Sequence, residues 1–298
     1  MKKLSRQKKE KKEMTFGEQM ISWAKTLLGA VVVVMIINGL AIASFVVPTG
    51  SMEKTVMTGD FLFVNKFIYG PSTPQVIPFV NVPLPYFRFP GIREPQPGDV
   101  IVFIFPGNRD EVEPSRFEYY LKRCVAIGGD TVEIIDKQLY VNGEPQPMPE
   151  HAMHDPGVPV FESEKWQTFP YGRGYTRVNY GPLRVPKKGD IIKLDRDNIR
   201  EWIVFIKREG HEVSADSKGI FIDGVGADQY TVERDYCFGM GDNRDHSLDS
   251  RYWGFIPVEN VVGTPIFVYW SWDTSLPITR IGDKLSSIRF PRIGTIID

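Results

Sequence analysis

The sequence predicts a mainly β fold, in which an antiparallel β-sheet domain follows a membrane anchor and is interrupted by an irregular β-rich insertion containing one short helix. Three observations predict this. The 27 Gly and 23 Pro among 298 residues favour turns and short strands over long helices. The 19 Phe, 12 Tyr and 6 Trp suit the pleated, half-buried faces of strands. One long apolar run stands near the N-terminus, and no other stretch approaches its length.

The overall composition is that of a globular protein. Hydrophobic residues make up 42% and charged residues 24% of the chain, which argues against a disordered chain, a collagen or a coiled coil. The net charge of −1 gives no reason to expect nucleic acid as a partner. Residues 1–25, however, carry eight basic and three acidic residues, so the rest of the chain has a net charge of −6. A basic N-terminal segment followed by a mildly acidic remainder is typical of a membrane-anchored protein.

Residues 27–47 form the predicted anchor. Their sequence, LLGAVVVVMIINGLAIASFVV, contains no charge and as a helix spans roughly 30 Å, the thickness of a hydrocarbon core. The basic residues before it make 1–26 a cytoplasmic segment and place the following domain outside the cytoplasmic membrane. A cleaved signal ending near Ala43 and a buried core helix are the alternatives, but the run is long for the first and has no polar face for the second.

Strand patterns dominate the external part. Asp136 and Lys137 separate two short strand patterns, which predicts a hairpin with a two-residue turn. Apolar residues at helical spacing across 198–209 predict the one soluble helix. Proline, glycine and histidine are frequent in 144–231, which we interpret as a non-catalytic insertion between catalytic segments 48–143 and 232–298. The predicted strands are 60–69, 100–105, 119–127, 131–135, 138–142, 220–223, 236–240 and 266–272.

Three segments carry candidate chemistry. Ser51 lies in a Pro-Thr-Gly-Ser-Met turn directly after the apolar run, where its hydroxyl would be close to a membrane surface. Lys122 interrupts an apolar, buried strand, and burial lowers the pKa of a lysine toward neutrality. The run GDNRDHSLDSR at 241–251 combines small and charged residues in a polar loop whose Asp–Arg pairs can hold a site rigid.

Taken together and in this order, PTGSM at 48–52, PGDV at 97–100, KRCVAIGGD at 122–130 and GDNRDHSLDSR at 241–251 resemble the bacterial type I signal peptidases. The resemblance covers nearly the whole chain and implies a serine protease with a Ser–Lys dyad. By motif position, Ser51 is the nucleophile and Lys122 the general base. Ser247 is expected to hydrogen-bond Lys122, and the Thr49 hydroxyl to assist the Ser51 N–H in an oxyanion hole. Asp249 and Arg251 are expected to brace the loop.

The resemblance also implies the substrates, which are exported pre-proteins cut after small residues in Ala-x-Ala sites at the outer membrane face. Shallow pockets near Phe61 and Ile101 are expected to accept these residues. The implied partners are the pre-proteins and the lipid bilayer, without nucleic acid, and the chain is expected to act as a monomer. No cofactor and no metal are expected.

Some features depart from the family pattern or leave alternatives open. Gly128-Gly129 stands where relatives usually have Pro-Gly, and His246 where they often have Asn. Ser51-Met52-Glu53-Lys54 also spells the S-x-x-K signature of penicillin-binding proteins, but the S-D-N and K-T-G partners are missing. A Ser51–His246–Asp triad, a His151–His154 metal site, a self-cleaving repressor and an inactive, anchored signal-peptide-binding relative are weaker readings. Cys124 and Cys237 are expected to be buried thiols, although a disulfide is permitted outside the cytoplasm.

Overall fold

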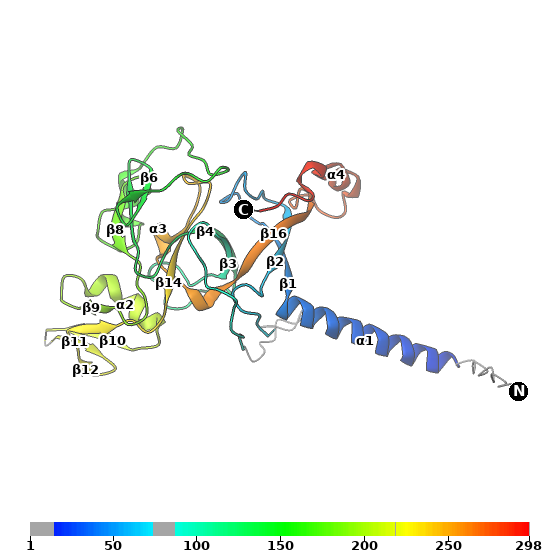
Figure 1. The fold of residues 1–298 in the computed structure, drawn as a ribbon, viewed down its shortest axis with the longest axis horizontal. Coiled ribbons are helices and arrows are strands. Elements are labelled where there is room, and N and C mark those ends of the chain that lie inside the picture. The colour runs from blue at the N-terminus through cyan, green and yellow to red at the C-terminus, as the bar shows by residue number, and fades with distance from the viewer. Residues whose placement is uncertain (1–14, 74–86, 218, 298) are drawn as a thin grey trace, which may run out of the picture.

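A computed structural model describes residues 15–73, 87–217 and 219–297 of the chain. A long helix projects from a body made of strands and loops, and the C-terminal segment returns to the same side of the body as that helix (Figure 1). Most of the basic residues of the predicted cytoplasmic segment, from Lys2 to Lys12, lie outside the described residues.

The body is organised by a seven-stranded sheet whose neighbouring strands are all antiparallel. The predicted mainly β fold is therefore confirmed. The last long strand in the sequence, β16, inserts between two early strands, so the sheet is complete only when both ends of the body have come together. In spatial order the strands are β1 (Ile42–Val46), β2 (Asp60–Asn65), β16 (Val261–Ser271), β3 (Val100–Ile104), β4 (Tyr119–Ile127), β14 (Tyr236–Met240) and β15 (Ile256–Pro257).

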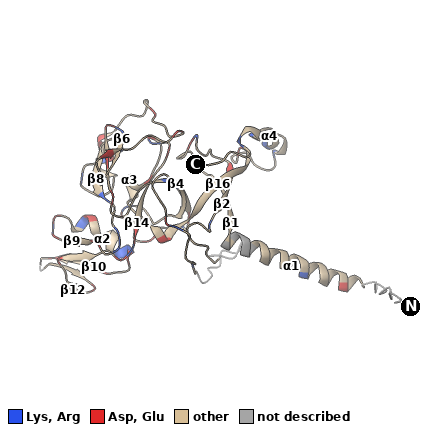
Figure 2. Cartoon of the chain, viewed as in Figure 1, with Lys and Arg blue, Asp and Glu red and all other residues tan. Residues whose placement is uncertain are grey.

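The N-terminal helix α1 spans Phe16–Leu40, and its charged residues Glu18 and Lys25 lie in its first half (Figure 2). The prediction of one continuous helical anchor over 27–47 is wrong at its C-terminal end, because Ile42–Val46 form strand β1 and pair with β2. A short apolar run fits a helix or a strand equally well, and here pairing with β2 decides. Among the described residues, none of the helices combines the length and apolar character that crossing a bilayer demands, so the expected transmembrane segment is not supported.

The region between β4 and β14 folds into smaller sheets (Figure 1). A four-stranded sheet has the order β7 (Glu144–Pro145), β6 (Gln138–Val141), β5 (Thr131–Ile135), β8 (Tyr180–Arg184). The predicted boundary at 143/144 therefore falls inside this sheet. The other strands are β9 (Ile191–Lys193) with β13 (Gln229–Thr231), and β10 (Val213–Asp216) with β11 (Gly219–Ile222) and β12 (Val225–Gly226).

Local sequence explains two elements of this region. Asp136 and Lys137 both adopt positive φ, 47° and 74°, as a two-residue hairpin turn that follows the strand twist requires. Helix α2 (Ile199–Arg208) buries Ile199, Phe205 and Ile206 against the core that β4 and β14 share with the insertion, and a 3₁₀ turn, η1, spans Glu162–Trp166.

The C-terminal segment is folded back onto the loop that carries Ser51. Asp60 at the end of this loop is fully buried and accepts hydrogen bonds from Ser271 Oγ at 2.7 Å and Met57 N at 2.8 Å. Arg292 completes the contact by an ion pair with Asp60 at 2.5 Å and a bond to the Thr55 carbonyl at 3.1 Å. The remaining short elements are α3 (Ser250–Trp253), η2 (Val258–Asn260), α4 (Ile281–Ser286) and η3 (Phe290–Arg292).

Candidate active site

Ser51 and Lys122, which are 71 residues apart in the sequence, meet in the structure. Lys122 Nζ donates a hydrogen bond to Ser51 Oγ at 2.6 Å and another to the Leu121 carbonyl at 3.1 Å. Lys122 lies in the middle of β4, where pairing with Ile101 of β3 fixes its backbone. A serine hydroxyl in short contact with an amine is the geometry of a nucleophile and its general base.

The surroundings of Lys122 favour its neutral form. The residue is 4% exposed, and this burial lowers the pKa of its amine from 10.5 to about 8. The negative charges of Asp249 and Asp242 act in the opposite direction, and the positive charge of Arg251 adds to the lowering. About a tenth of the amine is then unprotonated at pH 7, far more than for an ordinary lysine, and in this neutral form Nζ can accept the Ser51 hydroxyl proton.

The backbone around Ser51 is clamped by Asn243, which the sequence analysis did not single out. Asn243 donates from its backbone N to the Ser51 carbonyl at 3.0 Å and from Nδ2 to the Gly50 carbonyl at 3.1 Å. The next residue, Met52, is 1% exposed, and its sulfur accepts from Asp242 N at 3.2 Å. These contacts fix the Ser51 loop against the 241–251 loop. The sequence feature that could have identified Asn243 is its amide side chain within that polar motif.

Asp249 and Arg251 lie in the structural centre of the 241–251 loop. Asp249 is fully buried and accepts from Gly241 N at 3.0 Å, while a two-pronged ion pair joins it to Arg251, with both bonds at 2.8 Å. Burial raises the pKa of Asp249, but the Arg251 charge and the hydrogen bonds outweigh it and leave the pKa lowered. Arg251 also donates to the Arg244 carbonyl at 2.7 Å, so the pair holds both ends of the loop.

Ser247 does not make the contact with Lys122 that the sequence predicts, and Thr49 lies at the groove beside Ser51. Ser247 Oγ is buried without a hydrogen-bond partner, so the expected bond to Lys122 is absent from this structure. It lies close to the site nonetheless, because a Cβ added to Gly241 would come within 2.2 Å of Ser247 Oγ and 2.5 Å of the Ser51 carbonyl oxygen. Thr49 is exposed on the wall of the groove beside Ser51.

A groove of about 1020 Å³ runs past Ser51 and Lys122. One wall is strand β1 with the segment that leads to Ser51, and the opposite wall is the first half of β4. The two walls approach each other at Phe45 and Tyr119, whose ring centres are 4.9 Å apart. Apart from buried Lys122, its ionisable lining residues are Glu118, His246 and the tyrosines Tyr119 and Tyr120. The groove is therefore an apolar channel that suits an extended peptide chain.

The remaining candidate residues make other contacts. His246 lines the groove, but its Nε2 pairs with Asp155 at 3.0 Å rather than with Ser51, which weakens the triad alternative. Phe61 and Ile101 do not line the groove: Ile101 is fully buried and Phe61 packs against Tyr269. Within the described ranges, no group of three or more His, Cys, Asp or Glu is arranged to hold a metal.

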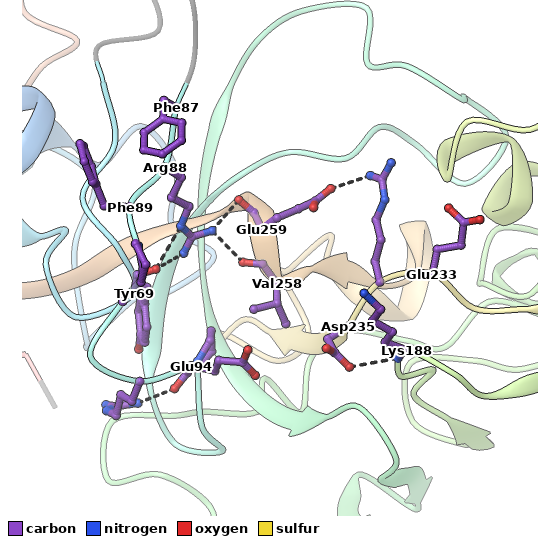
Figure 3. A pocket seen from close by; sticks show the side chains of 15 residues that line it. Tyr69, Phe87, Arg88, Phe89, Glu94, Lys188, Glu233, Asp235, Val258 and Glu259 are labelled. Carbon is purple, nitrogen blue, oxygen red and sulfur yellow. Dashed lines mark hydrogen bonds and ion pairs between the residues drawn. The ribbon is translucent and has the colours of Figure 1, made fainter.

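A second hollow, of about 730 Å³, has a different character (Figure 3). Arg88 enters it and donates to the Tyr69 carbonyl and to the Val258 and Glu259 carbonyls, the last two at 3.2 and 2.7 Å. Its guanidinium thus joins two chain segments. Acidic and basic residues alternate around the rest of the rim, which favours no single ligand charge. Cys124 and Cys237, deep in the adjoining core, are free thiols as expected.

Comparison with known proteins decides the family. Residues 20–270 match the family model described as signal peptidase, peptidase S26. The chain belongs to the S26 signal peptidase family. Signal peptidase I of Helicobacter pylori strain 26695 is 30% identical over 271 residues, covering 87% of this chain and 85% of that protein. Signal peptidase I of Pseudomonas aeruginosa is 29% identical over 293 residues, covering 93% and 79%.

A solved signal peptidase I from Enterococcus faecalis has 24% sequence identity and covers 58% of this chain and 98% of its own. Its TM-score of 0.25 is too low to add to the description of the fold. Membership of the S26 family makes this signal peptidase a serine endopeptidase. The family match also spans all four motifs, including the segments that hold Ser51 and Lys122.

Proposed function

We propose that this signal peptidase removes signal peptides from exported pre-proteins by a Ser51–Lys122 dyad. The observation that carries the proposal is the 2.6 Å contact between Lys122 Nζ and Ser51 Oγ in a buried setting. Neutral Lys122 takes the Ser51 proton as Oγ attacks the scissile carbonyl carbon. The resulting ammonium then protonates the leaving amine. In the second half, Lys122 deprotonates the water that attacks the acyl-enzyme and returns this proton to Ser51 Oγ as the ester bond breaks.

Charge that develops on the substrate carbonyl oxygen requires hydrogen-bond donors. We assign this role to the Ser51 N–H and the Thr49 hydroxyl, since both belong to the segment that forms the groove wall beside the nucleophile. Asn243 keeps this segment in place through the Gly50 and Ser51 carbonyls. Loss of one oxyanion donor lowers kcat by about 10²–10³ in serine proteases.

The groove supports an extended substrate with small residues next to the cleaved bond. Its walls are strands, and their approach at Phe45 and Tyr119 leaves little depth for bulky side chains. This geometry and the family resemblance support the proposal of cleavage after Ala-x-Ala. The proposed place of action is the outer face of the cytoplasmic membrane, with the N-terminus in the cytoplasm. The basic N-terminal segment and the apolar run that follows it support this placement. The proposed enzyme acts as a monomer.

The test uses the full chain in detergent and a purified pre-protein with one Ala-x-Ala site. Wild type should cut after the second Ala, while Ser51→Ala and Lys122→Met should lose at least about 10³-fold in kcat/KM. Lys66→Met is the matched control, because Lys66 is 7% exposed with a pKa lowered to about 8 but does not line the groove.

The alternatives give different outcomes in the same assay. Activity that survives in Lys122→Met and disappears in His246→Ala would replace the lysine by a histidine base. A wild type that binds the pre-protein without cutting it would be the inactive, signal-peptide-binding relative.

A further inference from the structure

The inserted region contacts the polar loop of the active site through a short segment, residues 151–155. Met153 N donates to the Asp242 carbonyl at 2.8 Å, and Arg244 N donates to the Met153 carbonyl at 3.0 Å. The two bonds form a parallel bridge between Met153 and Asn243. Asn243 is the residue that holds the backbone of Gly50 and Ser51, so the insertion contacts the nucleophile through one intermediate residue.

Side chains reinforce this junction around Asp245, whose side chain is 1% exposed. Asp245 accepts from Asp155 N at 2.8 Å, contacts His154 Nδ1 at 3.1 Å and forms an ion pair with Arg177 Nε at 3.1 Å. Lys137 Nζ lies 3.5 Å away. The centre of the junction, the Asp245–Arg177 pair, is nearly dry and joins the 241–251 loop to the insertion, whereas the His154 and Lys137 side chains are 24% and 32% exposed.

Arg177 extends the cluster into the insertion. Its side chain is 4% exposed, and it pairs with buried Glu164 and donates to the Val158 and Pro159 carbonyls at 2.9 and 3.0 Å. Its own carbonyl accepts from Arg251 Nη1 at 3.2 Å, so the insertion also contacts the residue that braces the 241–251 loop. A surface loop needs no such set of buried partners, because water satisfies exposed groups.

We propose that the inserted region positions the nucleophile: segment 151–155 holds Asp242–His246, and this loop holds Gly50 and Ser51 through Asn243. The proposal rests on the proposed function, since it assigns no new chemistry and adds positioning residues to the same reaction. Met153 acts through its backbone, and Asp245 and Arg177 act through the charge cluster. None of the three lines the substrate groove, so their loss should lower kcat and leave KM nearly unchanged.

The first test is Met153→Pro, which removes the N–H that bonds the Asp242 carbonyl. We expect about a tenfold loss of kcat, the equivalent of one to two hydrogen bonds, with KM within about twofold. The acid limb of the kcat/KM–pH profile should also move, because Asp242, Asp249 and Arg251 in the displaced loop act on the Lys122 amine. Val160→Pro is the control, since Val160 lies in the same insertion, is exposed, and its N–H bonds no described residue. A folded Met153→Pro enzyme with wild-type kcat and pH profile would overturn the proposal.

A second pair of variants decides the matter if Met153→Pro does not fold at the assay temperature. Arg177→Met should lower kcat, and Arg177→Lys should restore part of it, because a lysine keeps the charge opposite Asp245 and Glu164. Arg173→Met is the control for a neighbouring cation, since its side chain is 51% exposed. Wild-type kcat in both Arg177 variants would overturn the positioning role. Failure of the proposed function would look different: the wild type would not cleave the pre-protein, or the Ser51→Ala variant would still cleave it.

Discussion

Thr55 and Asp242 connect the two halves of the dyad. Thr55 Oγ1, in the loop that follows Ser51, donates to Asp242 Oδ2 at 2.6 Å. The same carboxylate forms a two-pronged ion pair with Arg123, the neighbour of Lys122 in β4, at 2.8 and 2.9 Å. One fully buried carboxylate therefore sets the position of the nucleophile loop relative to the strand of the base.

Asp242→Ala should destabilise the protein strongly. The change removes the carboxylate that pairs with the buried Arg123 guanidinium, and removing one member of a buried ion pair costs about 3–5 kcal/mol. Urea denaturation should show a free energy of unfolding lower by about that amount. Asp283→Ala is the control, because its pair with Arg280 is exposed and such pairs contribute less than about 1 kcal/mol. Equal losses in the two variants would contradict this prediction.

The activity should depend on the ionisation of Lys122. Since burial lowers the pKa of its amine to about 8, kcat/KM should rise about tenfold per pH unit below pH 8 and level off above it. The contribution of Lys122 to the free energy of unfolding should also rise with pH between about pH 8 and 10.5, because in this range the unfolded chain binds more protons than the folded one. A profile from pH 6 to 9.5 on a substrate without titrating groups near the cut measures the midpoint. A midpoint near 6.5 would indicate a histidine base instead.

Gly241→Ala should disable the site without adding any polar group. The new Cβ would meet Ser247 Oγ at 2.2 Å and the Ser51 carbonyl oxygen at 2.5 Å, so the Ser51 loop must shift. A displacement of about 1 Å can cost about 10²-fold in rate, and we expect a loss of this size in kcat. Gly282→Ala provides the comparison, because nothing lies within 4 Å of its Cβ. Wild-type cleavage by folded Gly241→Ala would show that the loop tolerates the shift.

Arg292→Met should reduce stability by about 2 kcal/mol, the typical cost of depriving a buried charged acceptor of a partner. Its guanidinium bonds Asp60 and the Thr55 carbonyl, which both belong to the loop after Ser51. Thermal and urea unfolding measure the loss in the free energy of unfolding. Arg280→Met is the matched control, because the Arg280 side chain is 63% exposed. If Arg292→Met unfolds at the wild-type urea concentration, the C-terminal segment does not stabilise this loop.

The sequence predicted those parts of the fold that depend on local patterns. The apolar and aromatic content of Tyr119–Ile127 and Tyr236–Met240 indicated strands with the bounds that the structure has. The segment Ile42–Val46 was misassigned because its apolar residues suit a helix as well as a strand, and only the backbone of β2 decides between them. The absence of the expected Ser247–Lys122 hydrogen bond depends on side-chain rotamers, which no motif specifies.

Part of the candidate site could also be predicted from the sequence, because local patterns mark some of its residues. A lysine inside an apolar strand is unusual at any single position, so Lys122 was identifiable, and the motif order pointed to Ser51. Asn243 was harder to single out, since its role comes from two backbone carbonyls that lie almost 200 residues away in sequence. The junction of Met153 with Asn243 could not be inferred at all, because irregular loops carry no periodic signal.

The position of β16 in the sheet has a consequence for the timing of activity during synthesis. This strand, Val261–Ser271, separates β2, which follows the nucleophile loop, from β3, the neighbour of the lysine strand. A nascent chain that has not yet delivered β16 cannot close the sheet, because long-range pairing must wait for both partners. The Ser51–Lys122 contact is therefore expected to form only after β16 has taken its place between β2 and β3.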